Sequence, residues 1–231
     1  MKTKELLRTI LSVFLLSLLL TSCSTDDTAA TDASPDLNLE HSIDVAQTDQ
    51  SLDVAFNIMN IAYAEIEEDE GRSVSLFSSC VTITISHQGG VTFVTLDFGL
   101  GCTLNNGAVV SGLIHFTYGP IQAGTVTITY SFENFVHNER AIEGEGSLFR
   151  ERNNAGGNPQ YTANHELVIT FPSGMVAEVD GTREVEWVEG VGSGIWSDNV
   201  FSVTGNRAIL LSTGFSHYAI VTEALRKEAS C

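Results

Sequence analysis

Residues 81–97 read VTITISHQGGVTFVTLD, and this stretch decides the fold class. Residues 81–86 alternate apolar and polar side chains, which is the period of a strand with one buried face, and residues 91–97 return as a second strand. The intervening His87-Gln88-Gly89-Gly90 has the composition of a turn. A connection this short requires antiparallel pairing, so the stretch predicts a β-hairpin.

The same alternation continues to the C-terminus, with turn signals such as Pro172-Ser173-Gly174 between the apolar stretches. An antiparallel meander over residues 71–231, with one buried and one wet face, is therefore expected. It can form a two-layer β-sandwich or a curved half-barrel, and the sequence leaves both open. The further strand candidates are residues 110–118, 124–134, 140–150, 161–171, 175–189, 199–204 and 217–225.

One helix is expected before the sheet, over residues 48–70. Its apolar side chains recur at three- and four-residue spacing and form one face, which we expect to pack on the β domain. Thr48, Asp49 and Ser51 are cap candidates, and the acidic run at 65–70 should end the helix. The residues of the apolar face are Leu52, Ala55, Phe56, Met59, Ala62, Tyr63 and Ile66.

The N-terminus has the order of an export signal. Basic residues precede an apolar run at 10–20, which is too short to span a membrane. Leu20-Thr21-Ser22-Cys23 then resembles the lipobox of bacterial lipoproteins. This predicts a signal peptide at 1–22, acylation of Cys23, and a flexible tether at 23–47 rich in Thr, Asp, Ala and Ser.

The residues after Cys23 indicate the membrane and the face of it to which the protein is sorted. Ser24 occupies the position where an aspartate would suggest retention in the inner membrane, and Asp26-Asp27 resembles a surface-export signal. We therefore expect the outer membrane, and the cell surface rather than its periplasmic face.

The net charge of −18 bears on partners. Binding to nucleic acid depends on Lys and Arg side chains that neutralise phosphates, so this composition excludes a nucleic-acid role. The expected contacts are the membrane, through the N-terminal lipid, and an unidentified ligand or protein partner.

Cysteine usage agrees with an exported protein, because the chain has no CxxC pair. Cys80 and Cys102 flank the hairpin, and we expect a disulfide between them. Cys231 can pair with another chain, displace one partner of that bridge, or remain free.

Several stretches resemble a group of uncharacterised Bacteroidota lipoproteins with a cysteine-bracketed hairpin. They are Cys80-Val81-Thr82-Ile83-Thr84, the segment Leu96-Asp97-Phe98-Gly99-Leu100-Gly101-Cys102, and Phe132-Glu133-Asn134-Phe135. The resemblance implies a lipobox, a tether, a short helix and a β domain. It also implies further strands beyond Cys231, and it transfers no activity.

The candidate motifs for catalysis or metal binding are all better explained as ordinary structural residues. No HxH, HExxH or GxSxG spacing occurs, and the oxygens at 97–106 are the usual residues of turns. The alternating carboxylates are expected on the wet face of the sheet rather than in a glycosidase site. No cofactor, metal or catalytic residue is predicted. The carboxylates concerned are Glu143, Glu145, Glu166, Glu184 and Glu186.

Trp187 and Trp196 flank a glycine-rich loop at 189–194, and they are the candidate binding surface. The leading functional hypothesis is a non-enzymatic, lipid-anchored protein that binds a ligand or a partner. A half-barrel carrier or sensor of an apolar molecule is the first alternative and requires a sizeable apolar cavity under the helix. A secreted hydrolase is the second, and requires carboxylates or histidines that converge in one cleft.

Overall fold

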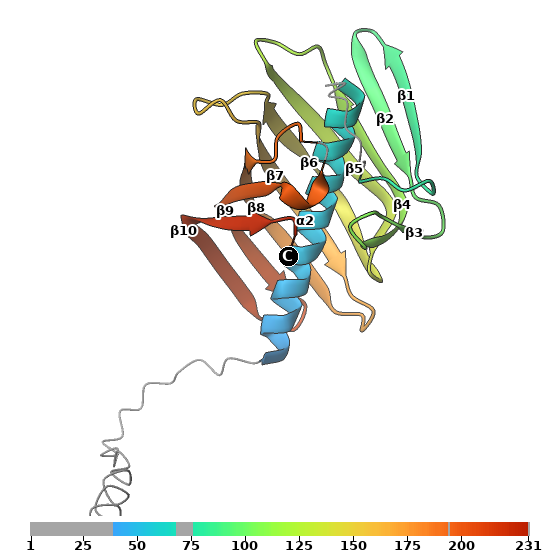
Figure 1. Ribbon diagram of the computed structural model, residues 1–231. Helices are drawn as coiled ribbons and strands as arrows, with labels where there is room; N and C mark the ends of the chain where they lie inside the picture. The colour runs from blue at the N-terminus through green and yellow to red at the C-terminus, as the bar shows by residue number, and fades with distance from the viewer. Residues whose placement is uncertain (1–38, 68–75, 194, 231) are drawn as a thin grey trace, which may run out of the picture. The chain divides into compact units, whose positions relative to one another are not determined.

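The computed structural model describes residues 39–67, 76–193 and 195–230, without the side chain of Trp196. The predicted signal peptide, Cys23, most of the predicted tether and Cys231 lie outside the described residues. The described residues belong to one compact unit. In it a long helix, α2, lies across one face of a β-sheet (Figure 1).

The sheet has ten strands in a meander, and it is not closed. Its order is β1-β2-β4-β5-β6-β7-β8-β9-β10, with the short β3 paired to β4. Every pairing is antiparallel, which confirms the predicted meander. The strands are β1 (Thr82–Gln88), β2 (Val91–Asp97), β3 (Cys102–Thr103), β4 (Val109–Tyr118), β5 (Thr125–His137), β6 (Arg140–Glu151), β7 (Gln160–Thr170), β8 (Val176–Glu189), β9 (Val200–Leu211) and β10 (Ser216–Glu228).

The sheet wraps around the helix, so the curved half-barrel describes the fold and the two-layer sandwich does not. Side chains of α2 contact strands from β4, through Tyr118, to β10, through Lys227. Phe56 of α2 contacts Tyr130 of β5 and His165 of β7, with ring centroids 6.1 and 5.2 Å apart. The helix therefore fills the concave face and forms one core with it.

The helix α2 (Leu39–Glu67) begins nine residues before the predicted start at Thr48. The predicted caps are interior residues: the Thr48 hydroxyl donates to the Asp44 carbonyl and the Ser51 hydroxyl to the Gln47 carbonyl. Val45 and Thr48 are buried against the sheet. This tertiary packing extends the helix into a segment whose composition resembles a tether.

The long helix of the described chain lacks the apolar length that a membrane span needs.

One strand is longer than its sequence pattern indicates. The predicted strand at 199–204 continues as β9 to Leu211, straight through Gly205. A glycine usually weakens a strand, but here its φ of 135° and the missing side chain allow close contact with β8. The turn to β10 lies instead at Ser212-Thr213-Gly214.

A disulfide joins Cys80 and Cys102, as predicted, with an S–S distance of 2.06 Å. Cys80 precedes β1 and Cys102 lies in β3, so the bridge brackets the β1–β2 hairpin at the edge of the sheet. All residues of β1 are exposed, so this strand gains little from burial, whereas β2 buries Val94 and Leu96 and pairs with β4. The bridge is therefore a constraint on the exposed edge strand.

Candidate functional site

Basic side chains gather under the helix. Most Lys and Arg side chains of the described residues contact side chains of α2, although the whole chain is strongly acidic. Burying a cation requires a partner, and α2 supplies carboxylates, amides and a hydroxyl for this purpose. The basic residues are Arg140, Arg150, Arg183, Arg207 and Lys227.

Two of these arginines come from a repeated Gly-x-Arg segment. Gly181-Thr182-Arg183 lies in β8 and Gly205-Asn206-Arg207 in β9, and the strands run antiparallel. In this register each arginine lies opposite the glycine of the other strand. A Cβ on Gly181 would lie 2.3 Å from the Asn206 carbonyl oxygen, and one on Gly205 would lie 2.1 Å from that of Thr182. Only glycine permits this close approach, which sets the two arginine side chains beside each other.

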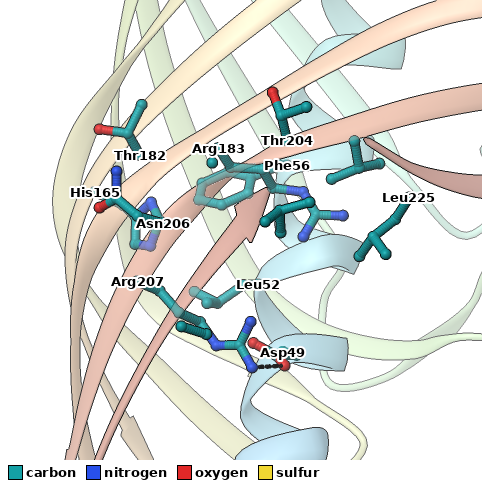
Figure 2. A pocket seen from close by; sticks show the side chains of 14 residues that line it. Asp49, Leu52, Phe56, His165, Thr182, Arg183, Thr204, Asn206, Arg207 and Leu225 are labelled. Carbon is teal, nitrogen blue, oxygen red and sulfur yellow. Dashed lines mark ion pairs between the residues drawn. The ribbon is translucent and has the colours of Figure 1, made fainter. Parts of the chain in front are cut away.

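The arginines line a pocket between α2 and the last strands of the sheet (Figure 2). Its cavity measures about 70 Å³, which is room for several waters or a few heavy atoms of a ligand. Its walls combine charged, polar and apolar side chains from five elements. They include Asp49, Leu52 and Phe56 of α2, His165 of β7, Arg183 of β8, Val203 and Arg207 of β9, and Ala219, Val221 and Leu225 of β10.

The pocket opens toward the edge strand. The pairing of β9 with β10 is interrupted by a bulge between Val221 and Leu225. Leu225 lines the pocket and is nevertheless 58 % exposed, so this wall borders on solvent. A bulge that disrupts pairing beside a pocket is a common way to shape an entrance.

The charges in the pocket are partly balanced. Arg207 pairs with Asp49 at 2.5 Å, Arg183 pairs with Asp53 at 2.5 Å, and Lys227 also contacts Asp53. Three cations thus face two carboxylates in this network, of which Asp49, Arg183 and Arg207 line the pocket itself. Burial raises the pKa of Asp49, and the adjacent Arg207 opposes this only in part. The pocket is therefore a cationic region in an acidic protein.

His165 is the most unusual residue in the pocket. Its side chain packs on Phe56 and is only 7 % exposed. Neither ring nitrogen has a hydrogen-bond partner among the described residues, and the same is true of the buried Nε of Arg207. Burial, reinforced by the Arg183 charge, lowers the pKa of His165 to about 4. The ring is neutral at pH 7 and offers one donor and one acceptor.

His137 illustrates the ordinary alternative for a buried histidine. Its Nδ1 lies 3.2 Å from the Ser51 hydroxyl, which also accepts a hydrogen bond from Arg140 Nε at 2.8 Å. Burial and the Arg140 charge lower the pKa of His137 to about 4. Here each polar group has a protein partner, so the cluster fastens α2 to the β5–β6 turn.

Catalytic pairing does not occur in the pocket as far as its residues are described. The Thr182 hydroxyl donates to Asn164 and the Thr204 hydroxyl donates to Glu184. Neither hydroxyl contacts His165, whose ring nitrogens have no partner there. A hydroxyl nucleophile needs a base within hydrogen-bond reach. Neither of these two described threonine hydroxyls is paired with a base in the pocket.

The carboxylates predicted on the wet face lie largely on the outer face of the sheet. Glu145, Glu166 and Asp180 are directly opposite one another on β6, β7 and β8, beside a broad open groove. Glu186 accepts hydrogen bonds from Asn154 and Asn158, which lower its pKa. Among the described residues no group of three or more His, Cys, Asp or Glu side chains is placed to hold a metal ion.

Other candidate residues have structural contacts. Asp97 Oδ1 accepts from the Gly99 N–H at 2.8 Å, and Asn106 Oδ1 accepts from the Ala108 N–H at 3.1 Å, as turn residues do. Trp187 packs against the core, with its ring centroid 5.9 Å from that of Phe201. Trp196 begins a short 3-10 helix, and its side chain lies outside the described residues. Trp187 thus belongs to the core, the predicted surface at Trp196 stays a prediction, and the pocket under α2 is a further candidate site.

Sequence reasoning missed His165, Arg183 and Arg207 as a site. His165 has the appearance of a core residue within an alternating strand, and only the fold shows that its nitrogens are left without partners. The repeated Gly-x-Arg was the available signal, since two arginines at inward-facing strand positions are unexpected in so acidic a chain.

No family model, curated protein or solved structure matches the chain significantly. The function of the pocket has to be inferred from its own chemistry.

Proposed function

We propose that this protein is a lipid-anchored, non-enzymatic binding domain of the cell envelope. It takes a small ligand into the pocket between α2 and β8–β10. The observation that carries the proposal is His165, a buried side chain at a cavity wall with two unsatisfied nitrogens. An unpaired buried polar group costs roughly 1–3 kcal/mol, and a ligand that bonds to it would recover this free energy.

The two alternatives fit the pocket less well. Carriers of drug-sized molecules have cavities of roughly 300–1,000 Å³ lined mostly by apolar groups. The pocket under α2 measures about 70 Å³ and its walls carry Arg, His and Asp side chains. A hydrolase would need a nucleophile paired with a base, and the described hydroxyls of the pocket have other partners.

The binding site can be tested with a cavity-filling variant. Ala219 lines the pocket, whereas Ala208 of β9 lies on the opposite face of the sheet at the outer groove. Ala219→Phe should fill the cavity, and Ala208→Phe is the matched control. The probes are three eight-carbon amphiphiles of different charge: octanoate, octanol and octylamine.

At least one probe should raise the melting temperature of the wild type and of Ala208→Phe, but not that of Ala219→Phe. A response of equal size in Ala219→Phe would show that binding occurs elsewhere. No response to any of the three probes would count against a ligand site in this pocket.

The proposed anchoring rests on the lipobox at residues 20–23. Protease treatment of intact cells should digest the domain if it lies on the outer surface, and digestion only after lysis would place it in the periplasm. A Cys23→Ala variant should lose membrane association, and its retention in the membrane fraction would refute lipid anchoring.

A further inference from the structure

We infer, building on the proposed function, that the pocket selects an anionic amphiphile: a carboxylate head with an apolar tail. The geometry points to this class because unsatisfied donors and cations meet an apolar wall in one cavity.

The hydrogen-bonding groups that are left unused in the pocket indicate the head group of the ligand. Arg183 Nε and Arg207 Nε are donors without an acceptor among the described residues, and neutral His165 carries one further unused donor. An ionised carboxylate accepts through both oxygens and donates nothing, so it suits a site whose unused groups are mostly donors. Hydrogen bonds from a guanidinium to a carboxylate are also stronger than those between neutral groups. An amine would bring more donors and a like charge.

The net charge of the pocket also favours a carboxylate head group. Among the lining residues Arg183 and Arg207 exceed Asp49 by one positive charge, and the adjacent Asp53 and Lys227 leave this excess unchanged. A monocarboxylate would balance this excess. The pair between Arg207 and Asp49 is also the main competitor, because a ligand carboxylate would share the guanidinium with Asp49.

The apolar wall of the pocket and its entrance indicate that the ligand carries an apolar tail. Leu52, Phe56 and Val203 line the inner part, and Val221 and Leu225 lie on either side of the bulge in β10. The cavity holds the head and a few carbons, so the rest of a linear tail would leave along these two side chains. A tail on Leu225 would cover part of a leucine that is otherwise 58 % exposed.

The test is isothermal titration of the full mature chain with octanoate, octanol and octylamine. Octanoate should bind at least 10-fold more tightly than octanol, and octylamine most weakly. Arg207→Gln should lower octanoate affinity about to that of octanol, whereas Ala208→Phe on the outer face should leave octanoate affinity unchanged. Asp49→Asn should raise octanoate affinity several-fold, because it removes the competing carboxylate.

The outcomes separate the two proposals. Equal or tighter binding of octanol or octylamine would overturn the choice of an anion, although the pocket would remain a binding site. Octanoate binding that neither Arg207→Gln nor Asp49→Asn changes would place the anion elsewhere and overturn the inference. Absence of binding by all three probes would overturn both proposals.

Discussion

A neutral histidine buried without a protein partner lowers the stability of the empty fold, and at His165 this cost depends on pH. Its folded pKa of about 4 lies below the ordinary value of 6.5. As the pH falls between these values, the unfolded chain binds a proton that the folded chain does not. The free energy of unfolding should therefore decrease across this window, by about 3 kcal/mol from His165 alone.

The variant His165→Leu should remove this contribution. Urea unfolding between pH 7 and 4 is expected to show a shallower decrease than in the wild type, with the share due to His137 remaining. At pH 7 the variant should be at least as stable as the wild type, since it replaces unsatisfied nitrogens by an apolar group of similar size. An unchanged pH dependence would show that His165 protonates normally in the folded protein.

At the scale of the elements, the ion pairs that dock α2 differ from ordinary surface pairs. Asp53 is partly buried and serves both Arg183 and Lys227. Asp53→Asn would leave two cations facing an amide. Buried pairs cost roughly 3–5 kcal/mol to break, so we expect a loss of about 2 kcal/mol for this partly exposed pair in chemical unfolding.

The matched control is Glu189→Gln, which breaks the exposed pair with Arg226. Exposed pairs contribute roughly 0–1 kcal/mol, so this variant should change little. Equal effects of the two substitutions would mean that the network under α2 does not hold the helix on the sheet.

The disulfide acts on the edge strand β1, whose residues are all exposed. The bridge closes a loop with a sequence separation of 22 residues. The chain-entropy model assigns about 3 kcal/mol to a loop of this length. Reduction, or the double variant Cys80→Ser with Cys102→Ser, should lower the stability by about this amount. Thermal unfolding with and without reductant measures it, and Cys231→Ser is the control that should keep the reductant sensitivity. A reductant-insensitive wild type would contradict this role.

Strand patterns could be predicted because they depend on local alternation, as at residues 81–97 and in β7. The start of α2 could not, since residues 39–47 become helical through the burial of Val45 and Thr48 against a sheet formed later in the chain. The pocket was unpredictable for the same reason. Arg183 and Arg207 meet only because β8 and β9 pair in one register, and nothing in the local sequence sets that register.

At the scale of the whole molecule, the fold separates its charges. Most described Lys and Arg side chains contact α2 inside the concave face, and the outer face is left with carboxylates that few cations oppose. Such a surface favours solubility but repels itself. The repulsion should be strongest where Glu166 lies between Glu145 and Asp180 on neighbouring strands.

Neutralising the central carboxylate should therefore stabilise the protein. Directly opposed like charges on adjacent strands are destabilising, so Glu166→Gln should raise the free energy of unfolding by about 0.5–1 kcal/mol at low salt. The gain should largely disappear at 1 M NaCl, where the screening length is about 3 Å. Glu223→Gln is the control, because Glu223 lies in the exposed bulge of β10 away from this row and should change stability less. If Glu166→Gln instead destabilised the protein at low salt, repulsion within this row of carboxylates would be refuted as a cost to the native state.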